Sequence, residues 1–170
     1  MPQIHVCPLS KIPATVSATG ARSLITLINK GTPVDRPIEI TAARHLNVPV
    51  SDIVVELEGH ILPAETHVAA IVDFVRDWDR AEPLLIHCYA GVSRSTAAAF
   101  IAACVLVPER PEIEIAQAIR AASPTASPNT LLVEVADRML ERNGRMVAAV
   151  KAIGRGEECM EGVPFALELS

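Results

Sequence analysis

Residues 83–95 read Pro-Leu-Leu-Ile-His-Cys-Tyr-Ala-Gly-Val-Ser-Arg-Ser, and this stretch decides the fold that we expect. Residues 84–88 form an apolar run, which is typical of a strand buried on both faces of a parallel sheet. Residues 96–107 are apolar nearly all round, which predicts a helix in the centre of the domain. The residues between them therefore form a loop that joins a buried strand to the beginning of a buried helix.

A loop in this position can bind an anion through its backbone. The first amides of a helix have no partner within the helix, and the helix dipole is positive at that end. Gly91 allows backbone conformations that point such amides inward. Cys88 would lie at the base of this cradle, where a thiolate is favoured over a thiol.

The loop has to act as a unit to ionise a cysteine. Shifting the ionisation of a cysteine by about three pH units requires on the order of 4 kcal/mol. A helix dipole supplies at most about 2 kcal/mol. The remainder must come from the converging amides, from Arg94 and from the hydroxyl of Ser95. Arg94 also offers a planar fork that can hold two oxygens of a phosphate, which a lysine could not do.

The spacing of His87, Cys88, Gly91, Arg94 and Ser95 resembles the HCxxGxxRS signature of the cysteine-dependent protein tyrosine phosphatase superfamily. We place the chain in the compact, dual-specificity-like branch. The resemblance implies hydrolysis of phosphomonoesters through a phosphocysteine, without a cofactor or metal. It implies catalytic roles for Cys88, Arg94 and Ser95, and a supporting role for His87. It also implies that the phosphate is bound by the residues of the loop, namely Tyr89, Ala90, Gly91, Val92, Ser93 and Arg94.

A carboxylic acid should face the loop, because a phosphoester leaving group departs more easily when it is protonated. Asp52 follows a strand-like run and lies at a place similar to the general acid of the resembling family. The alternative is that Asp52 only caps a turn. Glu56 and Glu58 compete for the role, since Gly59 indicates that they belong to a mobile loop.

Asn129 is a second supporting candidate. Residues 123–129, Ser-Pro-Thr-Ala-Ser-Pro-Asn, form a loop before a predicted helix. This loop resembles the family segment in which a Pro-Asn pair precedes a helix and the asparagine braces the phosphate loop. An ordinary helix N-cap is the alternative, because asparagine favours that position without any further function.

The remaining pattern predicts an α/β domain with a central, mostly parallel sheet of four or five strands flanked by helices, in the manner of a protein tyrosine phosphatase. The length of 170 residues fits one phosphatase domain that spans residues 1–170. We expect further strands at residues 4–7, 24–28 and 46–50, and further helices at residues 63–78, 111–122, 130–140 and 147–153.

Composition excludes several other classes of function. The net charge is -5, so neither nucleic acid nor an anionic membrane is an expected partner. The cysteines show neither zinc spacing nor disulfide density, so we expect free thiols at Cys7, Cys88, Cys104 and Cys159. The first residues do not read as a signal peptide, and the apolar segment at 97–107 is too short to span a bilayer. We therefore expect a cytoplasmic protein.

Some alternatives stay open. A sulfurtransferase or an arsenate reductase also places a reactive cysteine in an anion-binding loop, and a silent phosphate-binding module would use the same cradle without turnover. No Trp-Pro pair precedes Asp52, and the loop lacks the lysines typical of relatives that act on inositol lipids, since Tyr89, Ala90 and Val92 fill those places. The substrate is expected to be a phosphorylated protein or a small phosphoester. Neither its identity nor the oligomeric state follows from the sequence.

Overall fold

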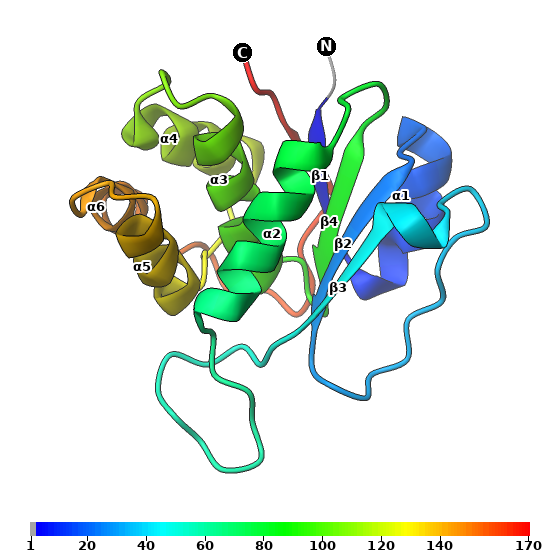
Figure 1. Cartoon of the computed structure of the whole chain (residues 1–170), viewed down its shortest axis with the longest axis horizontal. Coiled ribbons are helices and arrows are strands. Elements are labelled where there is room, and N and C mark those ends of the chain that lie inside the picture. The colour runs from blue at the N-terminus through cyan, green and yellow to red at the C-terminus, as the bar shows by residue number, and fades with distance from the viewer. Residues whose placement is uncertain (1–2) are drawn as a thin grey trace.

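A five-stranded sheet forms the centre of the chain in the computed structural model, which describes residues 3–170 (Figure 1). Its spatial order is β3-β2-β4-β1-β5. Four strands are parallel to one another, and β5 is antiparallel to β1. The strands are β1 (Ile4–Pro8), β2 (Ser23–Ile28), β3 (His45–Pro49), β4 (Leu84–Cys88) and β5 (Phe165–Leu167). The predicted α/β architecture with a mostly parallel sheet is confirmed.

Helices cover both faces of this sheet (Figure 1). One face carries only α1 (Ile12–Thr19), which packs through Ile12 and Val16 on Leu24 and Leu85. The other face carries the remaining helices and most of the core. These are α2 (Glu65–Asp77), α3 (Arg94–Leu106), α4 (Glu112–Ala122), α5 (Thr130–Met139) and α6 (Arg145–Ile153). Two short 3-10 helices, Leu9–Lys11 and Ala42–Arg44, complete the elements.

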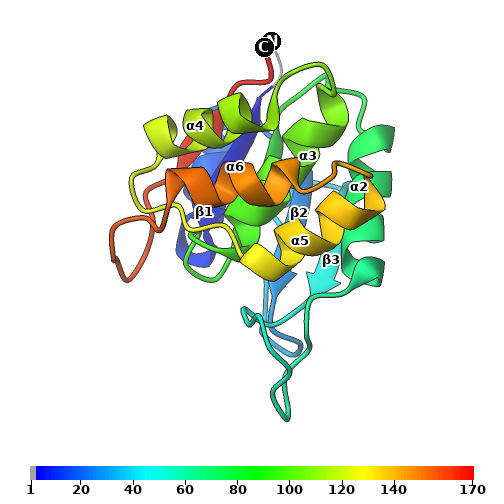
Figure 2. The same cartoon turned by 90° about the vertical axis from the view of Figure 1, so that its left-hand side faces the viewer.

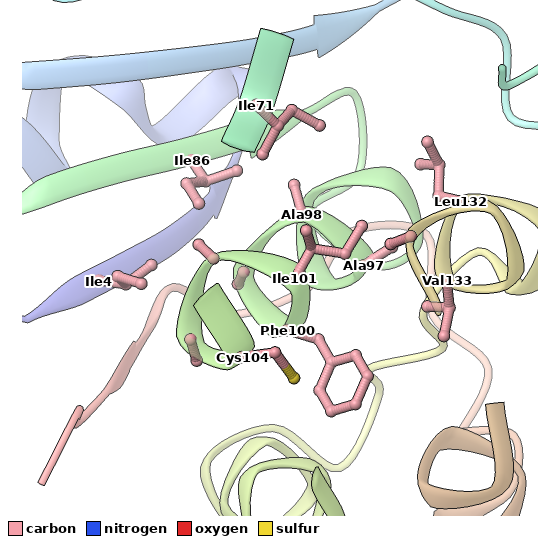
Figure 3. Close-up of a cluster of buried hydrophobic side chains, with 14 of the residues drawn as sticks. Ile4, Ile71, Ile86, Ala97, Ala98, Phe100, Ile101, Cys104, Leu132 and Val133 are labelled. Carbon is pink, nitrogen blue, oxygen red and sulfur yellow. The ribbon is translucent and has the colours of Figure 1, made fainter. Parts of the chain in front are cut away.

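The helix after the loop of residues 89–93 is central, as its composition predicted. Every residue of α3 from Arg94 to Cys104 is buried, because strands lie on one side and the other helices on the remaining sides. Figure 3 shows Phe100, Ile101 and Cys104 of this helix among the core side chains. Burial raises the pKa of Cys104 to about 12, so this thiol is an inert part of the core.

The parallel strands bring distant loops to one edge of the sheet. The carboxyl ends of β2, β3 and β4 lie side by side, because Ile28 pairs with Pro49 and Thr26 pairs with His87. The loop after β3 extends furthest from this edge and is the lower loop in Figure 1. Polar residues that directly follow these strands therefore meet at one place, which is the usual position of a site in such a sheet.

The end of the chain returns to the sheet, which the sequence did not predict. β5 pairs with β1, so that Ile4 lies opposite Leu167 and Val6 lies opposite Phe165. The segment between α6 and β5 passes the loop of residues 89–93 on the way, where the amide of Gly162 donates to the carbonyl of Ala90. Within residues 3–170, no helix is both long enough and apolar enough to cross a membrane.

Candidate active site

The loop from residue 89 to residue 93 turns its carbonyl groups outward. Each of four carbonyl oxygens accepts a hydrogen bond from an amide of another segment: Tyr89 from Leu9 (3.1 Å), Ala90 from Gly162 (2.8 Å), Val92 from Ser127 (2.9 Å) and Ser93 from Asn129 (3.1 Å). In a trans peptide the N–H points opposite to the carbonyl, so the amides that follow face the interior of the loop. Among residues 3–170, none of the amides of residues 89–93 has an acceptor.

Gly91 is required at its position for two reasons. Its φ is +70°, which side chains other than glycine rarely adopt. A Cβ atom at this residue would also lie 2.7 Å from the nitrogen of Pro8 and 2.8 Å from the carbonyl carbon of Cys7. The loop therefore rests directly on the backbone at the end of β1, and this contact fixes its height above the sheet.

The thiol of Cys88 lies at the base of this loop. It ends β4 and has only 2% of its surface exposed. Its Sγ lies 3.0 Å from the Oγ of Ser95, which belongs to the first turn of α3. A hydroxyl in this position can donate to an ionised sulfur, or to the sulfur as it leaves phosphorus.

Arg94, the first residue of α3, is buried and keeps one buried donor without a partner within residues 3–170. Its Nη1 donates to Oδ1 of Asn29 at 2.7 Å and to the carbonyl of Val50 at 3.0 Å. Its Nε is buried and has no hydrogen-bond partner among residues 3–170. A buried donor without an acceptor costs about 1–3 kcal/mol, so an oxyanion bound in the loop would relieve this cost.

His87 supports the loop from beneath the sheet and is fully buried. Its Nδ1 lies 3.1 Å from the carbonyl oxygen of Cys88, which can only accept, so Nδ1 carries the proton. Its Nε2 then accepts from the hydroxyl of Thr26 at 2.8 Å, and that hydroxyl accepts from Nε2 of His45 at 2.7 Å. Burial lowers the pKa of His87 to about 4, although the bond to Cys88 opposes the shift. Burial therefore favours the neutral form of this ring.

This burial makes the stability of the protein depend on pH. The folded pKa of His87 is about 4 against an ordinary value of 6.5, so the unfolded chain binds a proton that the folded chain excludes. The contribution of the buried, neutral His87 to the free energy of unfolding is complete above pH 6.5 and is lost as the pH falls toward 4. Between pH 7 and pH 4.5 we expect the free energy of unfolding to fall by about 2 kcal/mol through this group.

Urea unfolding of the wild type, of His87→Gln and of His60→Gln at both pH values measures this effect. His60 is exposed, so its variant serves as the matched control. The pH dependence should become shallower only in His87→Gln. An equal pH dependence in all three proteins would contradict the assignment.

Asp52 reaches the loop, as the sequence analysis required. Its Oδ1 accepts from Oγ of Ser93 at 2.7 Å and from Nδ2 of Asn129 at 3.0 Å, while the residue stays largely exposed. Glu56 and Glu58 are exposed on the same long loop, and neither forms a hydrogen bond or ion pair within residues 3–170. Of the three carboxylates, Asp52 is therefore the one that the fold holds at the loop.

Asn129 caps a helix and also contacts two loops. Its Oδ1 accepts from the amide of Leu132 at 3.0 Å, so it caps α5. Its backbone amide donates to Ser93, and its Nδ2 donates to Asp52 and to the carbonyl of Ile53 at 3.2 Å. One buried residue thus joins the helix and the acid-bearing loop through its side chain, and the loop of residues 89–93 through its backbone amide.

Several residues of the site were not predicted. Asn29 anchors the guanidinium, and its signal is that a polar residue directly follows a strand next to the cysteine strand. Thr26 and His45 support His87 through side chains that the sequence does not place together. Gly162, which holds the Ala90 carbonyl, has no sequence signal, since it lies in an irregular segment far along the chain.

Solved structures share this fold, although sequence comparison alone finds no relative: no protein-family model and no curated protein sequence matches the chain. DUSP15 is 17% identical, with 90% of this chain and 91% of that chain covered at a TM-score of 0.61. Human DUSP28 is 19% identical, with 88% and 94% covered at a TM-score of 0.58. PTPMT1, solved in complex with PI(5)P, is 19% identical, with 87% and 88% covered at a TM-score of 0.55.

These structures belong to the class that the signature predicted. The chain has the fold of the cysteine-based, dual-specificity-like phosphatases, over nearly its whole length. At these identities the likeness establishes the fold, and the chemistry has to be argued from the side chains of this chain.

Proposed function

We propose that the chain hydrolyses phosphomonoesters of the phosphotyrosine or dual-specificity type through a phosphocysteine on Cys88. The observation that carries this proposal is the buried Nε of Arg94, which has no hydrogen-bond partner within residues 3–170. Arg94 directly follows residues 89–93, whose amides face the interior of the loop. Such an arrangement of unused donors around a sulfur fits a bound phosphoryl group. The shared fold with dual-specificity phosphatases supports the same class.

In the first step, the thiolate of Cys88 attacks phosphorus and the bond to the ester oxygen breaks. Asp52 donates its proton to that oxygen, so the leaving group departs as a neutral alcohol or phenol. Oδ1 of Asp52 already accepts two hydrogen bonds, which leaves Oδ2 to carry the proton. Arg94 and the loop amides stabilise the equatorial oxygens.

In the second step, the phosphocysteine is hydrolysed. The carboxylate of Asp52 takes a proton from a water molecule, whose oxygen bonds to phosphorus while the phosphorus–sulfur bond breaks. Ser95 donates toward the departing sulfur, which its distance of 3.0 Å supports. Inorganic phosphate leaves, and Asp52 is again protonated for the next turnover.

The free thiols of the chain are consistent with a reducing compartment, and we place the protein in the cytoplasm.

A series of substrates with different leaving groups tests the reaction class and the acid together. In Asp52→Asn, kcat should fall roughly 100-fold or more for alkyl and simple phenyl phosphates. It should fall much less for aryl phosphates whose leaving groups depart without protonation. Asparagine keeps an acceptor for Ser93, which separates the loss of the proton from the loss of the loop contact.

Glu56→Gln and Glu58→Gln are the matched controls, because both residues lie on the same loop and both are exposed. They should leave the dependence on the leaving group unchanged. If one of them instead reproduces the pattern, the acid is misassigned. If thiosulfate or arsenate turnover exceeds aryl phosphate hydrolysis in the wild type, the proposed reaction class is wrong.

A further inference from the structure

A groove of about 730 Å³ opens beside the phosphate-binding loop. Its walls come from the loop that carries Asp52, from residues 127–130, and from the facing sides of α5 and α6. Figure 2 shows α5 and α6 side by side, with the start of α5 directed toward the acid-bearing loop. A volume of several hundred Å³ is typical of ligand sites.

The groove adjoins the edge of the proposed active site, although Cys88 and Arg94 do not line it. Asp52, Ser93 and Asn129 line it, and the same three residues are joined by hydrogen bonds at the edge of the phosphate-binding loop. A substrate whose phosphoryl group enters that loop therefore presents its neighbouring groups to the groove.

The lining combines an apolar floor with a cationic border. Val133 and Val150 are buried in the floor, and Val147 and Val54 are more exposed along it. Lys151 and Arg155, near the end of α6, stand at the border. Among residues 3–170, Lys151 forms no ion pair, and the contact of Arg155 with Glu158 is an exposed one at 3.8 Å.

We propose that this groove binds the peptide that flanks a phosphorylated residue, taking an apolar side chain on its floor and an anionic group at Lys151 and Arg155. The inference rests on the proposed function, which it extends to the choice of substrate. The anionic group is a carboxylate or a second phosphate, because both share the negative charge and the acceptor oxygens that two cations recognise.

The polar residues of the lining favour a peptide over a lipid chain. Thr130 adds a hydroxyl to the lining that can bond to the backbone of an extended peptide, whereas the hydroxyls of Ser93 and Ser127 already bond within the protein. A hydrocarbon chain would offer no acceptor to Lys151 or Arg155. Because the chain as a whole carries a net charge of -5, an acidic peptide is attracted locally, at Lys151 and Arg155, and not by the overall charge.

Kinetics with matched phosphotyrosine peptides test this proposal. One set carries Leu and Glu beside the phosphotyrosine, a second replaces Glu with Gln, a third replaces Glu with phosphoserine, and a fourth replaces Leu with Ser. Each set contains two peptides, one with the changed residues before the phosphotyrosine and one with them after it. The proteins are the wild type, Lys151→Glu and Arg138→Glu, whose cation is exposed on α5 outside the groove. The measured quantity is kcat/KM for each peptide, divided by kcat/KM for p-nitrophenyl phosphate.

In the wild type, this ratio should be about 5- to 10-fold higher for the Glu or phosphoserine peptide than for the Gln peptide, mainly through KM. It should also fall when Ser replaces Leu. Lys151→Glu should remove the preference for the anionic peptide, and Arg138→Glu should keep it. The comparison of Glu with phosphoserine identifies the source of the charge.

Three results would overturn the inference: no preference among the peptides, the same loss in Arg138→Glu, or a higher kcat/KM for phosphoinositide vesicles than for every peptide. Affinities of the same peptides for Cys88→Ser, measured by calorimetry, repeat the test without turnover. If p-nitrophenyl phosphate is not hydrolysed but the binding preference appears, the proposed reaction fails and the groove assignment stands.

Discussion

Replacing Cys88 with serine is expected to reduce hydrolysis of p-nitrophenyl phosphate by at least about 10,000-fold while leaving the binding of oxyanions intact. The sulfur is the only atom of the site that forms a bond to phosphorus in the proposed mechanism. The cradle of amides and Arg94 does not depend on it, because their positions are set by outward-facing contacts of the loop. Steady-state kinetics and calorimetric titration with tungstate measure the two properties separately.

Cys159→Ser is the matched control, since Cys159 is an exposed thiol away from the core. Its kcat and KM should equal those of the wild type. Retention of more than about 1% of the activity in Cys88→Ser would exclude a phosphocysteine. Loss of tungstate binding together with activity would point to a structural role for the thiol instead.

Replacing Arg94 with lysine is expected to lower kcat by about 1,000-fold and to weaken tungstate binding as well. One end of the guanidinium is held by Asn29 and Val50, and Nε has no partner within residues 3–170, so in the proposed mechanism it is free to donate to the anion. An ammonium group carries the same charge, but it cannot keep both anchors and donate two parallel bonds to a phosphate.

The control for this variant is Arg138→Lys, which changes an exposed arginine on α5 in the same way. Its kinetics should stay at the wild-type level. The two active-site variants are then distinguishable. Cys88→Ser should lose turnover but keep tungstate binding, whereas Arg94→Lys should reduce both. A kcat within tenfold of the wild type in Arg94→Lys would rule out the guanidinium as the phosphate clamp.

The strand, loop and helix around Cys88 could be predicted from the sequence because they form one continuous segment. An apolar run of five residues, a glycine and an apolar helix mark these elements in the local sequence, although the contacts that orient the loop come from distant segments. The predicted strand at residues 46–50 lies one residue earlier, at His45–Pro49. Its last predicted residue, Val50, instead supplies the carbonyl that anchors Arg94.

Elements with weak local patterns were not predicted. α1 buries only Ile12, Thr15 and Val16, which is too sparse a pattern to distinguish a helix from a loop. β5 has three residues and is a strand only because β1 is available to pair with it. Long-range pairing of this kind depends on the rest of the fold, and not on local propensity.

The roles of Asn129 could not be separated from the sequence for a chemical reason. An amide side chain has an acceptor oxygen and a donor nitrogen, so it can cap a helix and brace a loop simultaneously. The structure uses both ends in this way. Asn29, in contrast, becomes recognisable only after the register of β2 beside β4 is known.

The return of the chain to β1 has a consequence for protein synthesis. Gly162 holds the Ala90 carbonyl outward, and Phe165–Leu167 forms the fifth strand. A ribosome adds about 5–20 residues per second, so Cys88 and Arg94 emerge well before these last contacts exist. A nascent chain that ends before Gly162 lacks a donor that shapes the cradle. In the proposed mechanism, the polypeptide therefore completes its anion cradle only after the segment that precedes its final strand has docked.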